Sequence, residues 1–134
     1  MAALASLSQI LATLEPVLHE GSYVYCCLAD SAALPMADIL GLFREAEGVT
    51  AIVREDFAQS QGWQVLYRAA WITLNVHSDL AAVGLTAAFA AALGERGISC
   101  NVVAGAYHDH LFVPVDRAHD AMQALRRLQD EAKT

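Results

Sequence analysis

The order of elements predicted for the second half of the chain constrains the fold more than any other feature of the sequence. Residues 71–77 alternate between two sets of side chains, which predicts a strand with two distinct faces. A helix predicted over about 80–96 follows, and Gly97 would end it in the left-handed conformation. Two strands follow at 98–104 and 111–115. A last helix begins after Asp116, which would cap it. The second half therefore predicts the order β-α-β-β-α.

The first half repeats this order more faintly. Its predicted elements are a strand at 23–28, at most a short helix at 32–40, where Pro35 lies, a hairpin of 42–46 and 49–54 that turns at Glu47–Gly48, a short helix at 55–61 and a strand at 64–68. Two copies of one pattern, without obvious sequence identity between them, indicate tandem ferredoxin-like β-α-β-β-α-β units. We therefore predict an α+β fold with antiparallel sheets and helices on one face.

This pattern divides the chain into three segments. Residues 1–15 hold an N-terminal helix that ends before Pro16, residues 16–68 form the first unit, and residues 69–134 form the second unit. The second unit lacks a closing strand after its last helix. Another segment must cover that sheet edge, because an open edge of unpaired backbone groups invites aggregation.

The chain is apolar and acidic. Of its 134 residues, 56% are hydrophobic and the formal net charge is −7, which excludes a disordered chain and disfavours a nucleic-acid partner, since phosphate binding needs a basic surface. Alanines are concentrated in the helix predicted over 80–95, which carries almost no charge. A helix that is apolar on all sides is buried on all sides, so we expect a second layer over it and a homodimer or higher assembly.

The sequence also indicates a cytoplasmic protein that is not in a membrane. The N-terminal residues lack the positive charge of a signal peptide, and the apolar run 80–93 is interrupted by Gly84 and Thr86 and is too short to span a bilayer. The three cysteines lack CxxC spacing, so reduced thiols are expected rather than a disulfide framework. Cys26 and Cys27 are neighbours on a predicted strand and should point to opposite faces.

Two short segments resemble a known family. Residues 79–86, Asp-Leu-Ala-Ala-Val-Gly-Leu-Thr, follow a strand, open a helix and resemble the signature of ACT domains, which are small βαββαβ modules that bind amino acids and regulate enzymes. Residues 97–103 are similar to the family's second strand, which enters after a glycine and often carries an asparagine. The commoner signature places a Pro-Gly soon after the aspartate, whereas here Gly84 comes later and no proline is present.

Longer phrases resemble one family of standalone bacterial proteins with two tandem ACT-like units. They are residues 43–50, 71–78 and 100–115, and the likeness covers nearly the whole chain from Pro16 onward. The members of that family are largely of unassigned function. The resemblance implies a non-catalytic regulatory protein that binds a small molecule, an amino acid or similar metabolite, and acts in trans on a partner enzyme or transporter. The alternative is a structural module for oligomerisation that binds no ligand.

The resemblance also implies a ligand site where the second unit's first helix begins, at an interface between units. A helix N-terminus offers unpaired N–H groups to a carboxylate, Gly84 would let a ligand approach closely, and Asn101 carries both a donor and an acceptor. Each residue also has a plainer role: Gly84 in packing, Asn101 at a strand edge and Asp79 as a helix cap. The predicted ligand-binding residues are Asn75, His77, Ser78, Asp79, Gly84, Leu85, Asn101 and Val102.

His108-Asp109-His110 is the sharpest chemical feature of the sequence. Two histidines one residue apart lie on the same side of an extended chain, and His77 or His19 could join them in a set that suits Zn²⁺ or another divalent ion. The same residues could instead form a turn in which the aspartate bonds its own backbone. A small metal-dependent enzyme that uses His108 and His110 is therefore a third alternative.

Nucleophilic catalysis has little support in the sequence. The chain lacks a G-x-S-x-G or C-x-x-C motif and a glycine loop of the phosphate-binding type. Cys100 could pair with His77 or His108, but cysteines on strands are usually buried and inert. We therefore expect no enzymatic activity and no cofactor.

Overall fold

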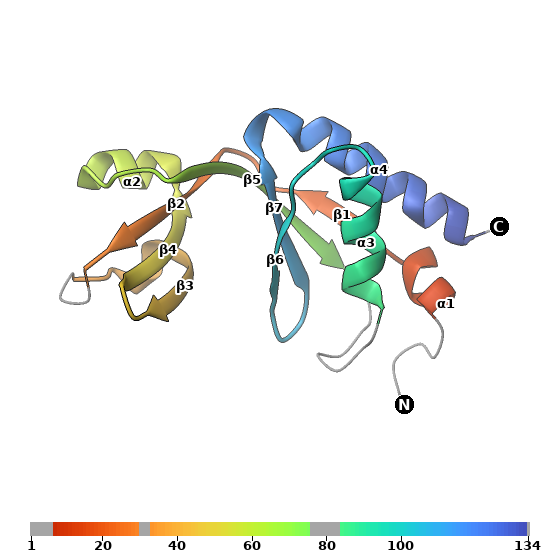
Figure 1. Cartoon of the computed structure of the whole chain (residues 1–134), viewed down its shortest axis with the longest axis horizontal. Helices are drawn as coiled ribbons and strands as arrows, with labels where there is room; N and C mark the ends of the chain where they lie inside the picture. Colours follow the sequence, from red (N-terminus) through yellow and green to blue (C-terminus); the bar gives the residue numbers. More distant parts are fainter. Residues whose placement is uncertain (1–6, 30–32, 76–83, 134) are drawn as a thin grey trace. The chain divides into compact units, whose positions relative to one another are not determined.

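The computed structural model describes residues 7–29, 33–75 and 84–133. The chain divides into two compact units (Figure 1). The middle unit spans Glu20–Ala69, and the terminal unit combines the chain up to His19 with the chain from Ala70 onward. The N-terminal segment therefore belongs with the second half of the sequence, although the prediction gave Pro16 through His19 to the first unit.

The middle unit is an antiparallel sheet with the strand order β3-β4-β2-β5. Its strands are β2 (Tyr23–Leu28), β3 (Ile39–Glu45), β4 (Gly48–Arg54) and the first residues of β5 (Tyr67–Asn75). The helix α2 (Glu55–Gln61) ends at Gly62, whose left-handed φ of 70° confirms the predicted stop. Between β2 and β3 the described residues hold only a short 3-10 turn, Met36–Asp38, so the first helix of this unit is vestigial.

The core of the middle unit lies between its sheet and α2. Val24, Cys26, Ala51 and Val53 project from β2 and β4 and pack with Ala58 of α2. Cys26 is buried and its neighbour Cys27 is exposed, which confirms that the two thiols point to opposite faces of the strand. The alternation of the sequence along these strands thus determines which side of the sheet the helix covers.

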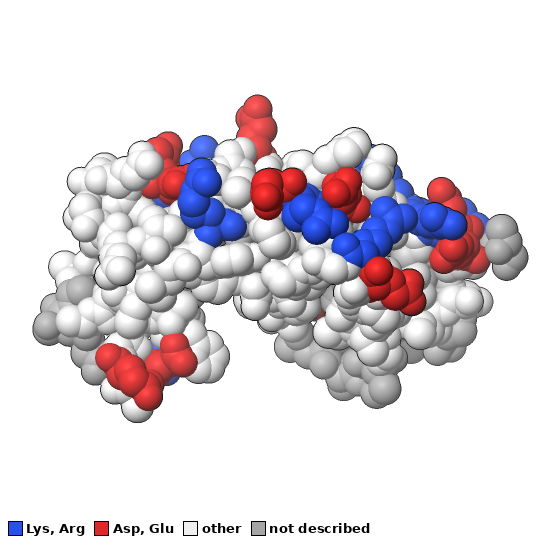
Figure 2. Space-filling model, turned by 45° about the horizontal axis from the view of Figure 1, so that its top comes forward, with Lys and Arg blue, Asp and Glu red and all other residues white. Residues whose placement is uncertain are grey.

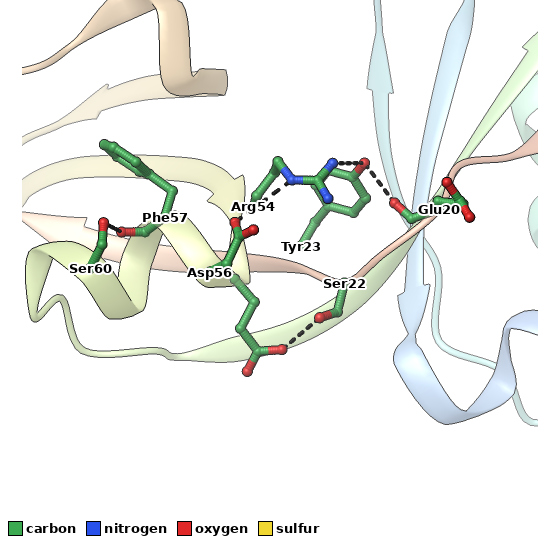
Figure 3. Close-up of polar contacts among 8 residues, drawn as sticks. Glu20, Ser22, Tyr23, Arg54, Asp56, Phe57 and Ser60 are labelled. Atoms are coloured by element: carbon green, nitrogen blue, oxygen red, sulfur yellow. Dashed lines mark hydrogen bonds and ion pairs between the residues drawn. The ribbon is translucent and has the colours of Figure 1, made fainter.

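Polar contacts tie the beginnings of β2, α2 and β5 together. The Ser22 hydroxyl donates to Glu55 Oε1 at 2.6 Å, and the Arg68 guanidinium donates to both carboxylate oxygens at 2.8 Å. These bonds, led by those from Arg68, lower the pKa of Glu55. Beside them Arg54 donates to the Tyr23 hydroxyl, which in turn donates to a backbone carbonyl (Figure 3).

The terminal unit is an antiparallel sheet with the order β1-β5-β7-β6, covered by two helices. Its elements are α1 (Leu7–Ala12), β1 (Glu15–Leu18), β5 from Ala70, α3 (Leu85–Gly94), β6 (Asn101–Ala104), β7 (Asp109–Pro114), a 3-10 turn (Val115–Arg117) and α4 (Ala118–Ala132). β1 pairs with β5 over Ile72–Asn75. The edge that the sequence left uncovered is therefore closed by a strand from the N-terminal segment.

The helices α3 and α4 of the terminal unit pack on one face of its sheet. Ile72 and Leu74 of β5 and Leu111 of β7 meet Phe89 of α3 and Leu125 of α4, all at 0% exposure. Leu14, just before β1, is also fully buried in this core. The predicted α+β class with antiparallel sheets and helices on one face is confirmed.

Several predicted boundaries were wrong. The strands expected at 64–68 and 71–77 are one strand, β5, because its first residues pair with β2 and its later residues pair with β1. Asp116 lies inside a 3-10 turn and does not cap α4, whose N-cap position is held by Arg117 without a side-chain bond. Gly97 has the left-handed φ of 69° that was expected after α3.

The helix α3 is buried on one side only within the chain. Leu85, Phe89 and Leu93 face the core, whereas Ala87 and Ala91 are exposed. Among the described residues of the terminal unit, nothing packs over the alanine side of this helix. A second chain on that side stays a prediction.

The burial of Leu14 gives a direct test of where the N-terminal segment belongs. Leu14→Ala removes a fully buried side chain from the terminal core and should lower the free energy of unfolding by about 2–5 kcal/mol. The matched control is Leu18→Ala on β1, whose side chain is 41% exposed and whose loss should cost less than about 1 kcal/mol. Urea denaturation measures both, and equal losses would contradict this packing.

Candidate functional site

The first candidate region is the N-terminus of α3. Gly84 takes the N-cap position with φ 93° and ψ −19°, a left-handed conformation that favours glycine. A Cβ built there would lie 3.5 Å from Leu7 Cδ2, so backbone conformation rather than space explains the glycine. The Gly84 carbonyl accepts the Ala88 N–H at 3.0 Å, and the first N–H groups of α3 therefore point out of its N-terminus.

The other predicted ligand-binding residues fall into three groups. His77, Ser78 and Asp79 lie outside the described residues. Leu85 is 3% exposed and packs with Ile10 and Leu11 of α1, and Val102 packs against the terminal core, so both side chains have structural roles. Asn75 ends β5 half-buried, and Asn101 begins β6 exposed, opposite Phe112 of β7. Asn75, Gly84 and Asn101 thus remain as described groups that a ligand can reach.

The second candidate region is a group of four side chains in the terminal unit, which we name the imidazole cluster: His19, Trp71, Thr73 and His110. His19 follows β1, and its backbone N–H donates to the Trp71 carbonyl at 3.0 Å. Its ring stacks on the Trp71 indole with centroids 3.5 Å apart and planes 13° from parallel. The cluster thus connects the end of β1 to β5.

Thr73 lies at the centre of the imidazole cluster. It is 7% exposed, the one polar or charged residue that is buried within the described part of the chain. Its hydroxyl oxygen lies 2.7 Å from His19 Nε2 and 3.1 Å from His110 Nδ1. The Trp71 indole N–H donates to the same His110 nitrogen at 3.1 Å. One threonine therefore links imidazoles from two different strands.

The chemistry of these groups sets the direction of every bond. An indole N–H can only donate, so His110 Nδ1 must be an acceptor and its ring proton belongs on Nε2. When the Thr73 hydroxyl donates to His110 Nδ1, it shares the single lone pair of that nitrogen with the indole N–H, and its oxygen accepts from His19 Nε2. The arrangement requires a neutral His110.

Electrostatics agree with this assignment. Burial lowers the pKa of His110, the positive charges of His108 and His19 lower it further, and Asp109 opposes them. Burial alone lowers the pKa of His19. Burial raises the pKa of Asp109. The Asp109 carboxyl only partly offsets the lowering of the His110 pKa.

The His108-Asp109-His110 motif connects β6 to β7. Asp109 and His110 are the first residues of β7, and the preceding bend is closed by a bond from the Gly105 N–H to the His108 carbonyl at 2.9 Å. A Cβ on Gly105 would lie 3.3 Å from His110 Nε2, so the glycine leaves room for that ring. No group of three or more metal-ligand side chains occurs within residues 7–29, 33–75 and 84–133.

Sequence reasoning found only part of this cluster. It named His19 as a residue that could approach His110, and it placed Trp71 and Thr73 on one face of a strand. It gave those two no role, because β1 was not predicted and nothing else brings His19 to that face. The signal available was the tryptophan and the threonine on the polar side of this otherwise apolar strand.

Charged side chains on α4 are paired locally. Arg127 lies 3.5 Å from Glu131 one turn away, and Arg117, just before the helix, lies 3.2 Å from Asp120. Figure 2 shows basic side chains interspersed with acidic ones on the face that it draws. Arg117 and Arg127 therefore each lie beside an acidic partner. No helix among the described residues is long and apolar enough to cross a membrane.

Comparison with protein families places both halves of the chain. Residues 2–70 match one ACT domain model and residues 67–127 match another. The chain belongs to the ACT domain family. The overlap of the two matches falls on β5, the strand that the two ACT units share. The recognition of tandem ACT units from the sequence is confirmed.

Solved structures support the same fold. A protein of unknown function from Vibrio cholerae, described as a possible transport protein, is 43% identical with a TM-score of 0.82, covering 92% of this chain and 95% of its own. A protein from Agrobacterium tumefaciens is 20% identical with a TM-score of 0.66, covering 87% and 89%. The regulatory subunit of aspartate kinase from Thermus thermophilus is 11% identical with a TM-score of 0.64, covering 84% and 95%. Curated proteins gave no match.

These findings support a regulatory, ligand-binding role. ACT domains are typically regulatory and non-catalytic, they bind small molecules and they form oligomers. The aspartate kinase subunits share the fold of this chain at low sequence identity. Neither of the two family models that match the chain is that of a catalytic family.

The position of Thr73 predicts a measurable cost for losing its hydroxyl. Thr73→Val keeps the shape but leaves His19 Nε2 and His110 Nδ1 without a shared partner, which should lower the free energy of unfolding by about 1–3 kcal/mol. Thr50→Val on β4 is the control, because that hydroxyl makes a bond to Glu45 at the surface. Its cost should be below about 1 kcal/mol in the same urea titration. Similar values for both variants would contradict a central role for Thr73.

The three cysteines should differ in reactivity. Cys100 packs against the terminal core, and burial raises the pKa of its thiol to about 11, while burial also raises the pKa of Cys26. Cys27 is exposed. A thiol reagent at pH 8 should therefore modify one thiol rapidly, and a Cys27→Ser variant should lose that phase. Fast modification of Cys100 in the folded protein would instead indicate a reactive site.

Proposed function

We propose that this protein is a non-catalytic sensor that binds an amino acid or a similar small metabolite and acts in trans on a partner enzyme or transporter. The observation that carries the proposal is the pair of ACT domains, which fill nearly the whole chain. The regulatory subunits of aspartate kinase that share its fold offer a parallel for such a role. Ligand binding would act by favouring one of two states of the protein with different affinities for that ligand.

The proposed site lies around the N-terminus of α3. An α-carboxylate would accept bonds from the free N–H groups of the first turn, where the helix also carries partial positive charge. Gly84 allows the close approach, and the amides of Asn75 and Asn101 offer oxygens to an ammonium group. The proposed lining is Asn75, His77, Ser78, Asp79, Gly84, Leu85, Asn101 and Val102, with Leu85 contributing its backbone.

We also propose that the protein is a cytoplasmic homodimer. The exposed alanines of α3 and the facing side of α4 border a groove of about 460 Å³, whose rim carries Glu95, Arg96, Arg127 and Glu131. Two acidic and two basic groups around small apolar residues suit a second copy of the same surface. An oligomerisation module without a ligand is the second candidate function, and this groove is the observation that favours it.

A thermal-shift screen of the twenty amino acids tests the sensor. A ligand present at a hundred times its dissociation constant stabilises the folded protein by about 2.7 kcal/mol, which raises the melting temperature measurably. Asn101→Ala should abolish the shift, because it removes an exposed amide of the proposed site. Gln123→Ala on the exposed side of α4 is the matched control and should keep it.

Two outcomes would contradict the proposal. The absence of a shift with every amino acid, together with a dimer in sedimentation, would favour the oligomerisation module. A shift that survives in Asn101→Ala would place the ligand elsewhere.

A further inference from the structure

β1 is a weakly held strand that completes the terminal unit. It has four residues, three of them exposed, and pairs with β5 from Glu15 opposite Asn75 to Leu18 opposite Ile72. The His19 N–H donates to the Trp71 carbonyl, and backbone groups alternate in direction along a strand. The backbone groups of Val17 therefore also point toward β5, whereas those of Pro16 and Leu18 point away from it. Few backbone bonds therefore hold β1 in place.

The imidazole cluster fastens the end of this strand. Through its ring, His19 contacts both the Trp71 indole and the Thr73 hydroxyl of β5. The Thr73 hydroxyl oxygen also lies 3.1 Å from Nδ1 of His110 on β7. The attachment of β1 thus extends across three strands of the sheet and depends on a chain of three side-chain hydrogen bonds.

A proton on His110 breaks this chain. In the neutral ring Nδ1 accepts from Trp71 and from Thr73. A protonated Nδ1 becomes a donor facing the indole N–H at 3.1 Å, so two donors oppose each other and the ring must move. Thr73 then loses its acceptor, and the hydroxyl that holds His19 loses its fixed orientation.

Other titratable and charged groups face these elements. His108 and Asp109 adjoin His110 in the chain, and the residue opposite His110 on β6 is the neutral Val103. α4 and the turn before it line a groove along β1 of about 710 Å³, and they contribute Asp116, His119 and Arg126. His108 and His119 are the other histidines among these groups.

We propose that His110, Thr73 and His19 form a pH-sensitive latch, which holds β1 on the terminal sheet while His110 is neutral and loosens it when His110 takes up a proton. This inference does not rest on the proposed ligand. It concerns the same strand, however, because Glu15 of β1 pairs with Asn75 at the end of β5. Loosening β1 would therefore also free the backbone of a proposed ligand-binding residue.

The sign of the effect follows from proton linkage. Because burial lowers the pKa of His110, the unfolded chain, with a histidine pKa of about 6.5, binds the proton more readily than the folded protein. The stabilisation is fully present above about pH 6.5 and is lost as the pH falls toward the lowered pKa. The latch is thus closed at neutral pH and opens on acidification.

Amide hydrogen exchange read by NMR tests the latch on the full chain. The protection factors of the Val17 and His19 amides, corrected for intrinsic exchange, should fall severalfold between pH 7.5 and 5.5, with a ceiling of about tenfold for one proton taken up by an open state whose histidine pKa is about 6.5. His110→Asn should remove this dependence, because an amide oxygen near the position of Nδ1 still accepts from Trp71 but cannot be protonated. His119→Gln is the control and should keep the dependence.

A second readout follows the cluster directly. Trp71 contacts the rings of His19 and His110, and a Trp63→Phe background removes the other tryptophan. The Trp71 fluorescence should then change with pH, with a midpoint below about 6.5. The same transition should be lost in His110→Asn. Equal protection at both pH values would overturn the proposal, as would a pH dependence that survives His110→Asn or disappears in His119→Gln. A His110 ring that titrates at or above 6.5 in the unmodified protein would overturn it without any variant.

Discussion

The pairing of β5 with two different strands is the constraint on which the rest of the structure depends. Its first residues, Tyr67–Ala69, pair with β2 and finish the sheet of the middle unit, and Ile72–Asn75 pair with β1 and begin the sheet of the terminal unit. A strand shared in this way couples the register of its two pairings, because a shift by one residue would turn the side chains of β5 to the wrong face in both units. It also determines that the terminal unit is built from two segments of the chain, one on each side of the middle unit.

Much of the fold could be predicted because local patterns and tertiary packing agree. β2 and α2 have the predicted bounds, Tyr23–Leu28 and Glu55–Gln61, since alternation and a glycine stop specify them within a few residues. β1 was missed because four residues that include Pro16 carry too weak a strand signal. Proline is tolerated at this position because its backbone nitrogen, which has no hydrogen to donate, points away from β5. That direction is known only once the pairing of β1 with β5 is known.

The two candidate sites also differ in whether their residues are neighbours in sequence. The N-terminus of α3 was predicted because the glycine and the strand before it are neighbours in sequence. The imidazole cluster was not, because His19 and Thr73 are 54 residues apart and meet only through β1. A buried threonine with two imidazole partners is a property of tertiary structure, and no spacing rule along the chain contains it.

The origin of β1 has a consequence for how the protein forms during synthesis. All residues of the middle unit, Glu20–Ala69, leave the ribosome before β5 is complete, so that unit can begin to fold while β1 waits without a partner. The terminal unit then closes a loop around an already structured insert, and the cost of that closure depends on the separation of the insert's two ends and not on its length in residues. The strand β1 is thus made before the strands of the middle unit and can pair only after β5 has been made.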